Sequence, residues 1–308
     1  MKEYTHLLID GRNVLYRALF AELKYLRPGE YAREPKNGSI FKAFLKFIRD
    51  YQKKFGPKEV HIFWDDKSKN LWRRQKYSEY KCNRKHVTEG MPELLSKYYN
   101  LSLIVFENMG IKQYLRDGQE ADDLIYSFCK VTDEPCCLLS SDSDLKQIRQ
   151  RMPNVDIYSP MAKDNYEPVG IPDFDITLQK ALMGDSSDNI SGYAGIGEKR
   201  AAALARDPKA LEEFFVSEKA IVIDENKNKV KIGKTLFESN LELVDLSKSP
   251  FMDENIEYVK WVKSRDVVYN HSELLRVLRK YKMDSVLEDV HTICIPFANL
   301  TIGKSHGK

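Results

Sequence analysis

The sequence predicts an α/β fold with a central, mostly parallel β-sheet flanked by helices. Four apolar runs that lead into acidic residues are expected to be buried strands, at residues 5–10, 59–66, 101–108 and 136–144. Segments with helical periodicity lie among them, at residues 13–26, 39–55 and 121–131. Strands that alternate with helices in this way are typical of a parallel sheet with helices on its faces.

The composition is that of a folded globular protein. The chain has 308 residues, of which 42% are hydrophobic and 31% charged, and a disordered chain would carry far fewer apolar side chains. The length allows one large domain or two modest ones. No apolar run is long enough for a signal peptide or a membrane span, so we expect a cytoplasmic protein without membrane contact.

The cysteines and histidines lack the spacings of familiar metal or nucleophilic sites. The five cysteines are odd in number and include no C-x-x-C pair, which argues against a disulfide framework and against a zinc site. The six histidines show no H-E-x-x-H or similar spacing, and no G-x-S-x-G motif is present. The carboxylates are therefore the best candidates for chemistry.

The second part of the chain differs in character from the first. Prolines at 153, 160, 168 and 172 mark a looser stretch, and the sequence beyond it is mainly helical. We place a boundary near residue 178, with a core at 1–178 and a second part at 179–308. The segment IVIDENKNKVKIGK at 221–234 predicts a β-hairpin or a charged excursion.

Acidic residues gather where predicted strands end and helices begin. In open parallel sheets these positions share one edge, where ligands bind. A single strand-end aspartate is usually a turn or cap residue, but here four separate segments bring acids to the same edge. Like carboxylates at close range need a compensating cation, and oxygen ligands suit Mg²⁺ or Mn²⁺. The candidates are Asp10, Asp65 or Asp66, Glu120, Asp122, Asp123, Asp142, Asp144, Asp185 and Asp188.

A pair of divalent ions in such a site can activate a water and offset charge on a phosphodiester. The predicted chemistry is therefore that of a nuclease. The net charge of +3 is small, but the charges are segregated: from Lys67 to His86 there are eight Lys or Arg residues and one acid, Glu79. This run is a solvated helix face or a surface that neutralises phosphates, with affinity that falls as salt rises.

Six motifs, in order, resemble the flap endonuclease and 5′ nuclease family, particularly bacteriophage 5′ to 3′ exonucleases and phage ribonuclease H enzymes. They are LLIDGRNVLYRA, FWDDKSKNLWRR, YKCNR, EADDLI, LLSSDSDLKQI and MGDSSDNISGYAGIGEKRAA. The resemblance extends from about residue 5 to 205, with a weaker match at 240–247. It implies a PIN-like 5′ nuclease core, a helical arch at about 67–100, and a helix-three-turn-helix element that holds duplex DNA.

The resemblance also implies roles for individual residues. Asp10 and Asp142 are expected to be central to catalysis, and Asp123 to be a supporting ligand. Alignment on the WRR string favours Asp65 over Asp66, whereas alignment on the DK pair favours Asp66; we prefer Asp65. The first metal ion would be surrounded by Asp10, Asp65, Glu120, Asp122 and Asp142, and the second by Asp144, Asp185 and Asp188.

Residues that bind nucleic acid follow from the same resemblance. Lys81 would reach the scissile phosphate with help from Arg84, Tyr80 would stack on a base, and Arg17 would contact another phosphate. The turn GYAGIGEKR would bind the backbone of duplex DNA, because its glycines permit close approach and the amides at the helix start face a phosphate. The resemblance also implies that this turn holds K⁺. Its residues are Gly195, Gly197, Lys199 and Arg200.

These observations predict a metal-dependent, structure-specific 5′ nuclease that acts on flaps, nicked or branched duplexes and RNA primers annealed to DNA. It is expected to be a monomer, phage-encoded and working in the bacterial cytoplasm, with a single-strand-binding protein or a polymerase as a protein partner. One alternative is a phosphatase or ribonuclease on a similar acidic core. Another is a DNA-structure-binding protein that has lost its chemistry.

Overall fold

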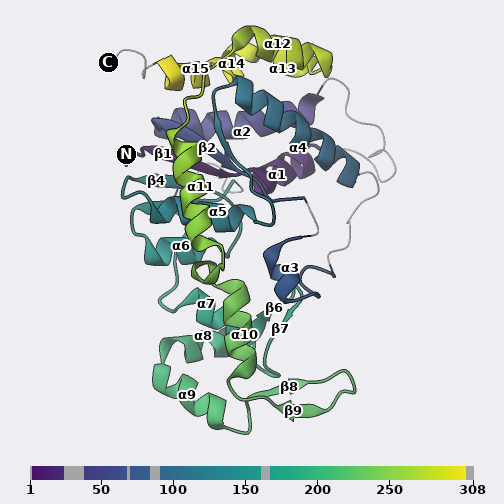
Figure 1. Cartoon of the computed structure of the whole chain (residues 1–308), viewed down its shortest axis with the longest axis vertical. Coiled ribbons are helices and arrows are strands. Elements are labelled where there is room, and N and C mark those ends of the chain that lie inside the picture. Colours follow the sequence, from purple (N-terminus) through teal and green to yellow (C-terminus); the bar gives the residue numbers. More distant parts are fainter. Residues whose placement is uncertain (1, 24–37, 68–69, 84–90, 161–166, 303–308) are drawn as a thin grey trace.

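The computed structural model describes residues 2–23, 38–67, 70–83, 91–160 and 167–302. Its centre is a five-stranded sheet of parallel strands in the order β3-β2-β1-β4-β5, which confirms the predicted α/β class. Figure 1 shows the sheet in an elongated molecule with helices on both sides. The strands are β1 (His6–Asp10), β2 (Glu59–Phe63), β3 (Lys112–Tyr114), β4 (Cys136–Leu139) and β5 (Val155–Tyr158).

Three of the four predicted strands are present, as β1, β2 and β4. The prediction for 101–108 is wrong, because these residues form the second half of helix α4 (Met91–Asn108). Leu101, Val105 and Phe106 are buried there, and a short apolar run fits a buried helix as well as a strand. The strand comes later, as β3, and β5 has no counterpart among the predicted strands.

Alternate residues of β1 enter two different cores, as the pleat of a strand requires. Leu7 and Ile9 belong to the first core and Leu8 to the second. Helices α1 (Gly11–Leu23), α2 (Ser39–Phe55) and α4 cover the first. The predicted helix at 39–55 is confirmed, and it ends where Gly56 adopts a φ of 55°. The last helices pack over α2 and α4: α12 (His271–Lys280), α13 (Asp284–Glu288), α14 (Val290–Ile293) and α15 (Ile295–Ile302).

The second core lies on the other face of the sheet. Helix α5 (Ala121–Lys130) packs directly on β1 and β2, in agreement with the helix predicted there. Helix α11 (Met252–Ser264) covers α5 and β3, and Figure 1 shows it running alongside the sheet. The 3-10 helix Leu246–Lys248 and α6 (Lys146–Arg151) complete this side.

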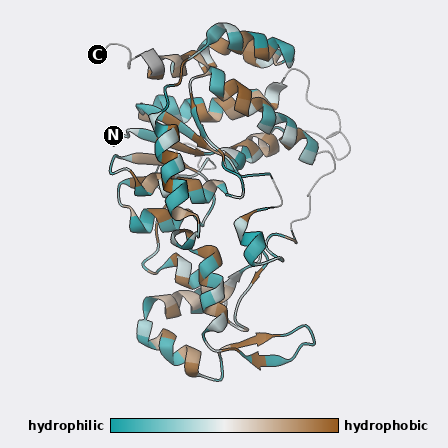
Figure 2. Ribbon diagram, in the orientation of Figure 1, coloured by the Kyte–Doolittle hydropathy of each residue, from teal (hydrophilic) through white to brown (hydrophobic). Residues whose placement is uncertain are grey.

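A third core holds together the end of the molecule below the sheet in Figure 1. The predicted hairpin at 221–234 is confirmed as the antiparallel pair of β8 and β9. Figure 2 shows apolar residues on this hairpin. Two of its apolar side chains, Ile223 and Val230, are exposed. The elements here are α7 (Ile176–Met183), β6 (Gly184–Asp185), β7 (Ile190–Ser191), α8 (Glu198–Arg206), α9 (Pro208–Val216), β8 (Ile221–Ile223), β9 (Lys229–Lys231) and α10 (Thr235–Val244).

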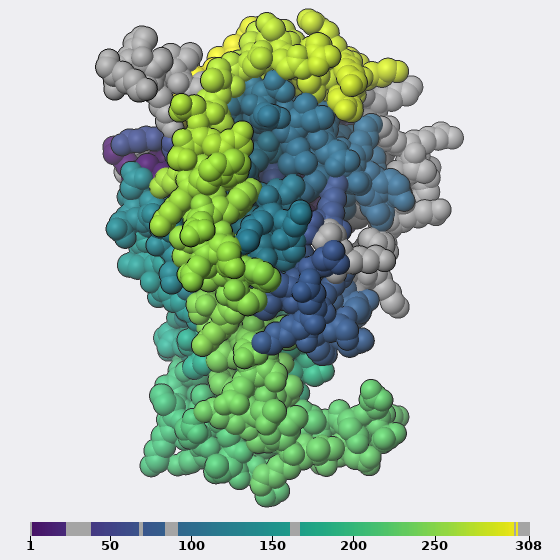
Figure 3. Space-filling model, viewed as in Figure 1, coloured from purple at the N-terminus to yellow at the C-terminus, as the bar shows by residue number. Residues whose placement is uncertain are grey.

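The short helix α3 (Trp72–Lys76) lies between the sheet and this third core. Figure 3 shows the surface hollowed between the segment around α3 and the β8–β9 hairpin. The predicted boundary near residue 178 falls within α7, and α11–α15 return to the sheet layers; the two-part division stays a prediction. Among the described residues, no helix has the length and apolar character needed to cross a membrane.

Candidate active site

The carboxyl ends of β1 and β4 hold the first two acids in place. Asp10 is the last residue of β1, and its Oδ1 accepts a hydrogen bond from Asn13 N at 3.1 Å as α1 begins. Its Oδ2 accepts one from Ser140 Oγ at 2.9 Å, and the same Oγ accepts from Asp142 N at 3.0 Å. Ser140 follows β4 directly. Asp10 and Asp142 therefore sit at adjacent strand ends, the place where parallel sheets bind ligands.

The acids predicted for the first metal line one cavity of about 350 Å³. Burial, with repulsion from Asp65 and Asp142, raises the pKa of Asp10 to about 7. Burial, reinforced by Asp142 and Asp10, also raises the pKa of Asp122 well above its usual range. These side chains resist carrying charge together, which a bound cation would relieve. The acids that line this cavity are Asp10, Asp65, Glu120, Asp122 and Asp142.

Asp65 and Asp66 have different surroundings. Asp65 lines the cavity, where its Oδ2 lies 3.5 Å from Arg12 Nη1, and its Oδ1 accepts a hydrogen bond from Ala121 N at 2.9 Å. Asp66 instead accepts from Gly118 N at 2.7 Å, in the turn that precedes α5. This geometry supports the preference for Asp65 as the ligand.

A second cavity, of about 440 Å³, adjoins the first and shares Glu120, Asp122 and Asp142 with it. Asp144, Asp185 and Asp188 each offer it one oxygen, and these oxygens lie within 4.8 Å of one another. Within the described part of the chain, the first set of acids does not bring three oxygens that close together. The structure thus gathers the predicted second set tightly and spreads the first set around its cavity.

Lys180 lies among the acids of the second set, and the sequence analysis did not identify it as a site residue. Its Nζ donates to Asp185 Oδ2 at 2.8 Å and also to Asp144 Oδ1. Burial opposes its charge, but Asp144 and Asp185 outweigh burial and raise the pKa of Lys180. Burial and repulsion from Asp142 nevertheless raise the pKa of Asp144 to about 6. The sequence signal that could have identified Lys180 was its position in α7, five residues before Asp185.

Lys81 lines both cavities. Its φ is 58°, an unusual value for a residue with a side chain, and its N donates to Asp188 O at 2.9 Å. The ammonium contacts Glu120 Oε1 and lies 3.7 Å from Asp188 Oδ2. Burial alone would raise the pKa of Glu120, but Lys81 and Arg73 outweigh it and lower the pKa to about 2. An ammonium group is therefore held against Glu120, in the wall of both cavities.

Asp123 is not placed as a metal ligand, which corrects the sequence prediction. It is fully buried, and its oxygens accept from Arg73 Nη1 at 2.9 Å, from Arg73 Nη2 at 2.8 Å and from Trp72 Nε1 at 3.1 Å. It also accepts from Glu120 N at 3.2 Å, as part of the capping box that starts α5. Asp123 anchors α3 to α5 and lines neither cavity.

Tyr80 does not fit the predicted base-stacking role, because its side chain is 3% exposed. Its hydroxyl oxygen lies 3.0 Å from Glu120 Oε2 and 3.0 Å from Asp188 Oδ2, and these two acceptors share its single proton. Arg17 lines the first cavity and donates from Nη2 to Ser141 Oγ at 2.9 Å; its contact with a phosphate stays a prediction. Arg84 lies outside the described residues, as does the rest of 84–90, the middle of the predicted arch.

The predicted duplex-binding turn leads into α8. Gly195 has a φ of 72°, which a glycine adopts at little cost. Open space surrounds the positions where Gly195 and Gly197 would carry a Cβ, so another backbone can approach closely. Lys199 and Arg200 are exposed in the first turn of α8. Gly197 borders the second cavity, which connects this turn to the acids.

The donor set suits divalent metal ions. The predicted ligands that line the cavities are carboxylates, the oxygen ligands that Mg²⁺ and Mn²⁺ prefer. Burial, followed by repulsion among the carboxylates, raises the pKa values of Asp10, Asp122 and Asp144, and a bound cation would favour their charged forms. The residues present therefore fit the predicted ions.

Comparisons with known proteins identify a nuclease family. The family described as "5′-3′ exonuclease, N-terminal resolvase-like domain" matches residues 5–173. A 5′-3′ exonuclease of Halalkalibacterium halodurans is 31% identical over 234 residues, which cover 68% of this chain and 72% of that protein. DNA polymerase I of Caldicellulosiruptor bescii is 28% identical over 297 residues, covering 91% of this chain but 33% of the polymerase.

A solved structure shows the same fold. The bacteriophage T5 flap endonuclease, in a complex with DNA and metal ions, superposes with a TM-score of 0.60 at 19% identity. The match covers 89% of this chain and 99% of the phage protein.

Proposed function

The chain belongs to the 5′-3′ exonuclease family, and from that premise we propose that it is a metal-dependent, structure-specific 5′ nuclease. It cuts phosphodiester bonds near the junction between duplex DNA and a 5′ single-stranded flap, at nicks and at overhangs. The observation that carries the proposal is the position of Lys81, a cation that lines two adjoining cavities walled by carboxylates from separate chain segments.

The chain's own residues have distinct roles in this reaction. Asp10, Asp122 and Asp142 would hold one divalent ion, and the trio within 4.8 Å, Asp144, Asp185 and Asp188, the other. When bound, the two ions supply Lewis-acid activation of water and offset charge on the phosphate. Lys81 neutralises the scissile phosphate as charge develops on it. Asp65 would be a further ligand of the first ion, and Glu120 completes the wall of the first cavity.

Lys180 supplies positive charge in the second cavity when no metal ion is bound there. Its ammonium bridges Asp144 and Asp185, so it keeps these carboxylates together before an ion arrives. The carboxylates of Asp144 and Asp185 that accept from Lys180 would also hold the second divalent ion, and Lys180 would then pair with a phosphate of the substrate.

The turn before α8 would hold the duplex. Its exposed glycines and the cations Lys199 and Arg200 meet phosphates, so selection is for the shape of the nucleic acid rather than its sequence. Charge contacts of this kind do not distinguish ribose from deoxyribose, and the proposal therefore includes RNA primers annealed to DNA. Potassium at this turn is part of the same proposal, held by backbone carbonyls.

Cleavage of a 5′-labelled flap substrate tests the proposed function. We expect Mg²⁺-dependent cutting near the junction, no cutting in EDTA, and slow cutting of a single-stranded oligonucleotide. The variant Asp142→Ala should bind the flap within a few-fold of the unmodified protein without cutting it. Tight binding by the unmodified protein with no cleavage in Mg²⁺ or Mn²⁺ would instead identify a DNA-structure-binding protein. Preferred cleavage of single-stranded RNA would identify a ribonuclease.

A further inference from the structure

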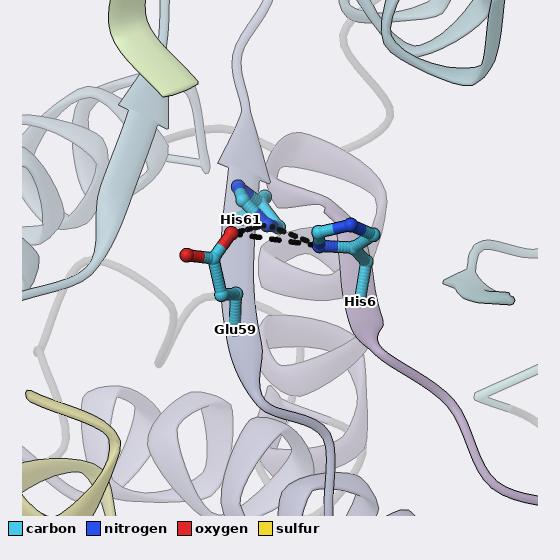
Figure 4. Close-up of side chains that lie close together, drawn as sticks. All are labelled: His6, Glu59 and His61. Carbon is cyan, nitrogen blue, oxygen red and sulfur yellow. Dashed lines mark hydrogen bonds and ion pairs between the residues drawn. The ribbon is translucent and has the colours of Figure 1, made fainter. Parts of the chain in front are cut away.

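A group of potential metal ligands lies at the opposite edge of the sheet from the acids. His6 begins β1, and Glu59 and His61 lie at the start of β2, where His6 pairs in register with Glu59. Figure 4 shows the three side chains turned toward one another. His6 and Asp10 are four residues apart on one strand, which separates them by about 13 Å at the usual rise per residue. The group is therefore distinct from the nuclease cavities.

The spacing of the three nearest atoms is that of ligands around one ion. His6 Nδ1 lies 3.1 Å from His61 Nε2 and 3.6 Å from Glu59 Oε2, and His61 Nε2 lies 3.3 Å from Glu59 Oε2. A tetrahedral Zn²⁺ with bonds of about 2.0–2.1 Å has ligands about 3.3–3.4 Å apart. The triangle already has these dimensions, so binding needs little movement of the side chains.

The second nitrogen of each imidazole has a partner of its own. His6 Nε2 lies 2.8 Å from Glu134 Oε2, and His61 Nδ1 lies 3.0 Å from the Tyr114 hydroxyl. Histidines that bind metals commonly donate their other N–H to an oxygen in this way, because the contact fixes the tautomer and the ring orientation. With those protons on the outer nitrogens, His6 Nδ1 and His61 Nε2 present lone pairs toward Glu59.

The surroundings favour rigid, neutral imidazoles. His6 is 1% exposed and His61 fully buried, and both rings pack on Phe128 of α5, at 5.2 and 4.7 Å between centroids. Glu59 divides its oxygens: Oε2 faces the histidines, and Oε1 lies 3.7 Å from Lys112 Nζ. Its side chain is 17% exposed, so Glu59 is the member of the group that solvent reaches.

We propose that His6, Glu59 and His61 form a binding site for a single Zn²⁺ or similar transition-metal ion, with water in the fourth position. Two imidazoles and a carboxylate suit Zn²⁺, whereas the all-carboxylate nuclease cavities suit Mg²⁺ or Mn²⁺. The chain thus carries two kinds of metal site that select different ions. The transition-metal ion joins the start of β1 to the start of β2 and stabilises the folded sheet without taking part in cleavage.

The sequence does not reveal this site because its ligands are spread along the chain. His6 and His61 are separated by 55 positions, and the pairing of β1 with β2 brings them together. The competing explanation is a hydrogen-bonded cluster without an ion, in which one proton on His61 Nε2 is shared by His6 Nδ1 and Glu59 Oε2. The two explanations differ in whether the folded protein takes up a nitrogen-ligated metal.

Titration with Co²⁺ distinguishes them. The full chain, stripped of metal by a chelator, is held in excess Mg²⁺ to fill the carboxylate cavities, and Co²⁺ is added while the visible spectrum is recorded. We expect one equivalent to give the intense bands of tetrahedral, nitrogen-ligated Co²⁺, and Zn²⁺ to abolish them. Glu59→Gln should lose the bands, and Glu134→Gln should weaken binding by about 10-fold, as loss of an outer partner does.

Two further variants serve as controls. Asp144→Asn alters only the carboxylate cavity and should keep the bands, as should His291→Gln, an exposed histidine on α14. Glu59→Gln is preferred to a His61 variant because replacing a fully buried ring also tests folding, and it should still cleave flaps in Mg²⁺. The proposal is overturned if folded protein gives no tetrahedral bands, if Glu59→Gln leaves them unchanged, or if Asp144→Asn removes them.

Discussion

Asp122 and Asp123 are neighbours in the sequence but face opposite surroundings. Asp123 makes a buried, two-point ion pair with Arg73, with N–O distances of 2.9 and 2.8 Å. Asp122 lines both acidic cavities, and burial together with Asp142 and Asp10 raises its pKa well above the usual range. Asp123 therefore has a cationic partner within the fold, whereas the charge on Asp122 is disfavoured until a cation binds.

The variant Asp123→Asn should destabilise the protein. It leaves the Arg73 guanidinium buried with Glu120 as its remaining carboxylate, and removing one partner of a buried pair typically costs about 3–5 kcal/mol. Urea unfolding in EDTA measures the change. The control is Asp173→Asn, whose partner Arg206 is exposed, and its unfolding midpoint should not move. A metal-ligand role for Asp123 predicts the opposite, greater stability without metal.

Asp122→Asn should stabilise the metal-free protein and inactivate it. Removing this charge relieves repulsion from Asp142 and Asp10, so the midpoint of urea unfolding in EDTA should rise. Cleavage in Mg²⁺ should fall by at least about 100-fold, because the electrostatic stabilisation of the transition state is lost. A variant that is both destabilised and active would contradict the placement of Asp122 in the metal site.

The sequence predicted the acidic edge better than the roles of its members. Strands that end in acids can be recognised from apolar runs, and Asp10, Asp142 and the trio beyond them lie where expected. The side-chain direction at the start of α5 was not predictable, because Asp122 and Asp123 differ only in which side of the helix they occupy. The sequence analysis missed Lys180 and assigned Tyr80 a base-stacking role that its buried hydroxyl does not fit. Both errors arose because long-range contacts, and not the local sequence pattern, set the positions of these side chains.

The contribution of Asp10 to the stability of the metal-free protein should fall as pH rises from about 4 toward 7. The folded-state pKa of Asp10 is raised to about 7 from 3.8, so the folded protein binds more protons than the unfolded chain between these values. The contribution of Asp10 is thus present below pH 3.8 and lost as pH passes through about 7. Unfolding curves in EDTA at several pH values should show a shallower fall for Asp10→Asn.

Excess Mg²⁺ should offset this loss. An ion that binds the folded protein stabilises it by mass action, and ionised carboxylates bind it better than protonated ones. The gain in midpoint on adding Mg²⁺ should therefore be larger at pH 8 than at pH 5. An equal gain at both pH values would show that the titrating carboxylates do not hold the metal.

Lys81→Ala should slow cleavage with little effect on duplex affinity. The ammonium touches Glu120 and lies between the two cavities, so we expect a loss of about 10²–10³ in the single-turnover rate. Lys76→Ala is the matched control, since Lys76 pairs with Glu242 on the surface, and it should cut at the normal rate. A defect in binding alone would refute the proposed contact with the scissile phosphate.

Replacing Lys199 and Arg200 together by alanine should flatten the salt dependence of duplex binding. Each phosphate contact contributes about 0.9 to the slope of log K against log salt, so losing both should reduce the slope by up to about 2. Arg279 and Lys280 provide a matched pair of exposed adjacent cations at the end of α12, which Figure 1 places at the other end of the molecule from α8. Their double alanine variant should keep the full slope. If the α8 variant keeps its slope while the α12 variant loses it, duplex DNA lies against the opposite end of the protein and the turn before α8 is not its binding site.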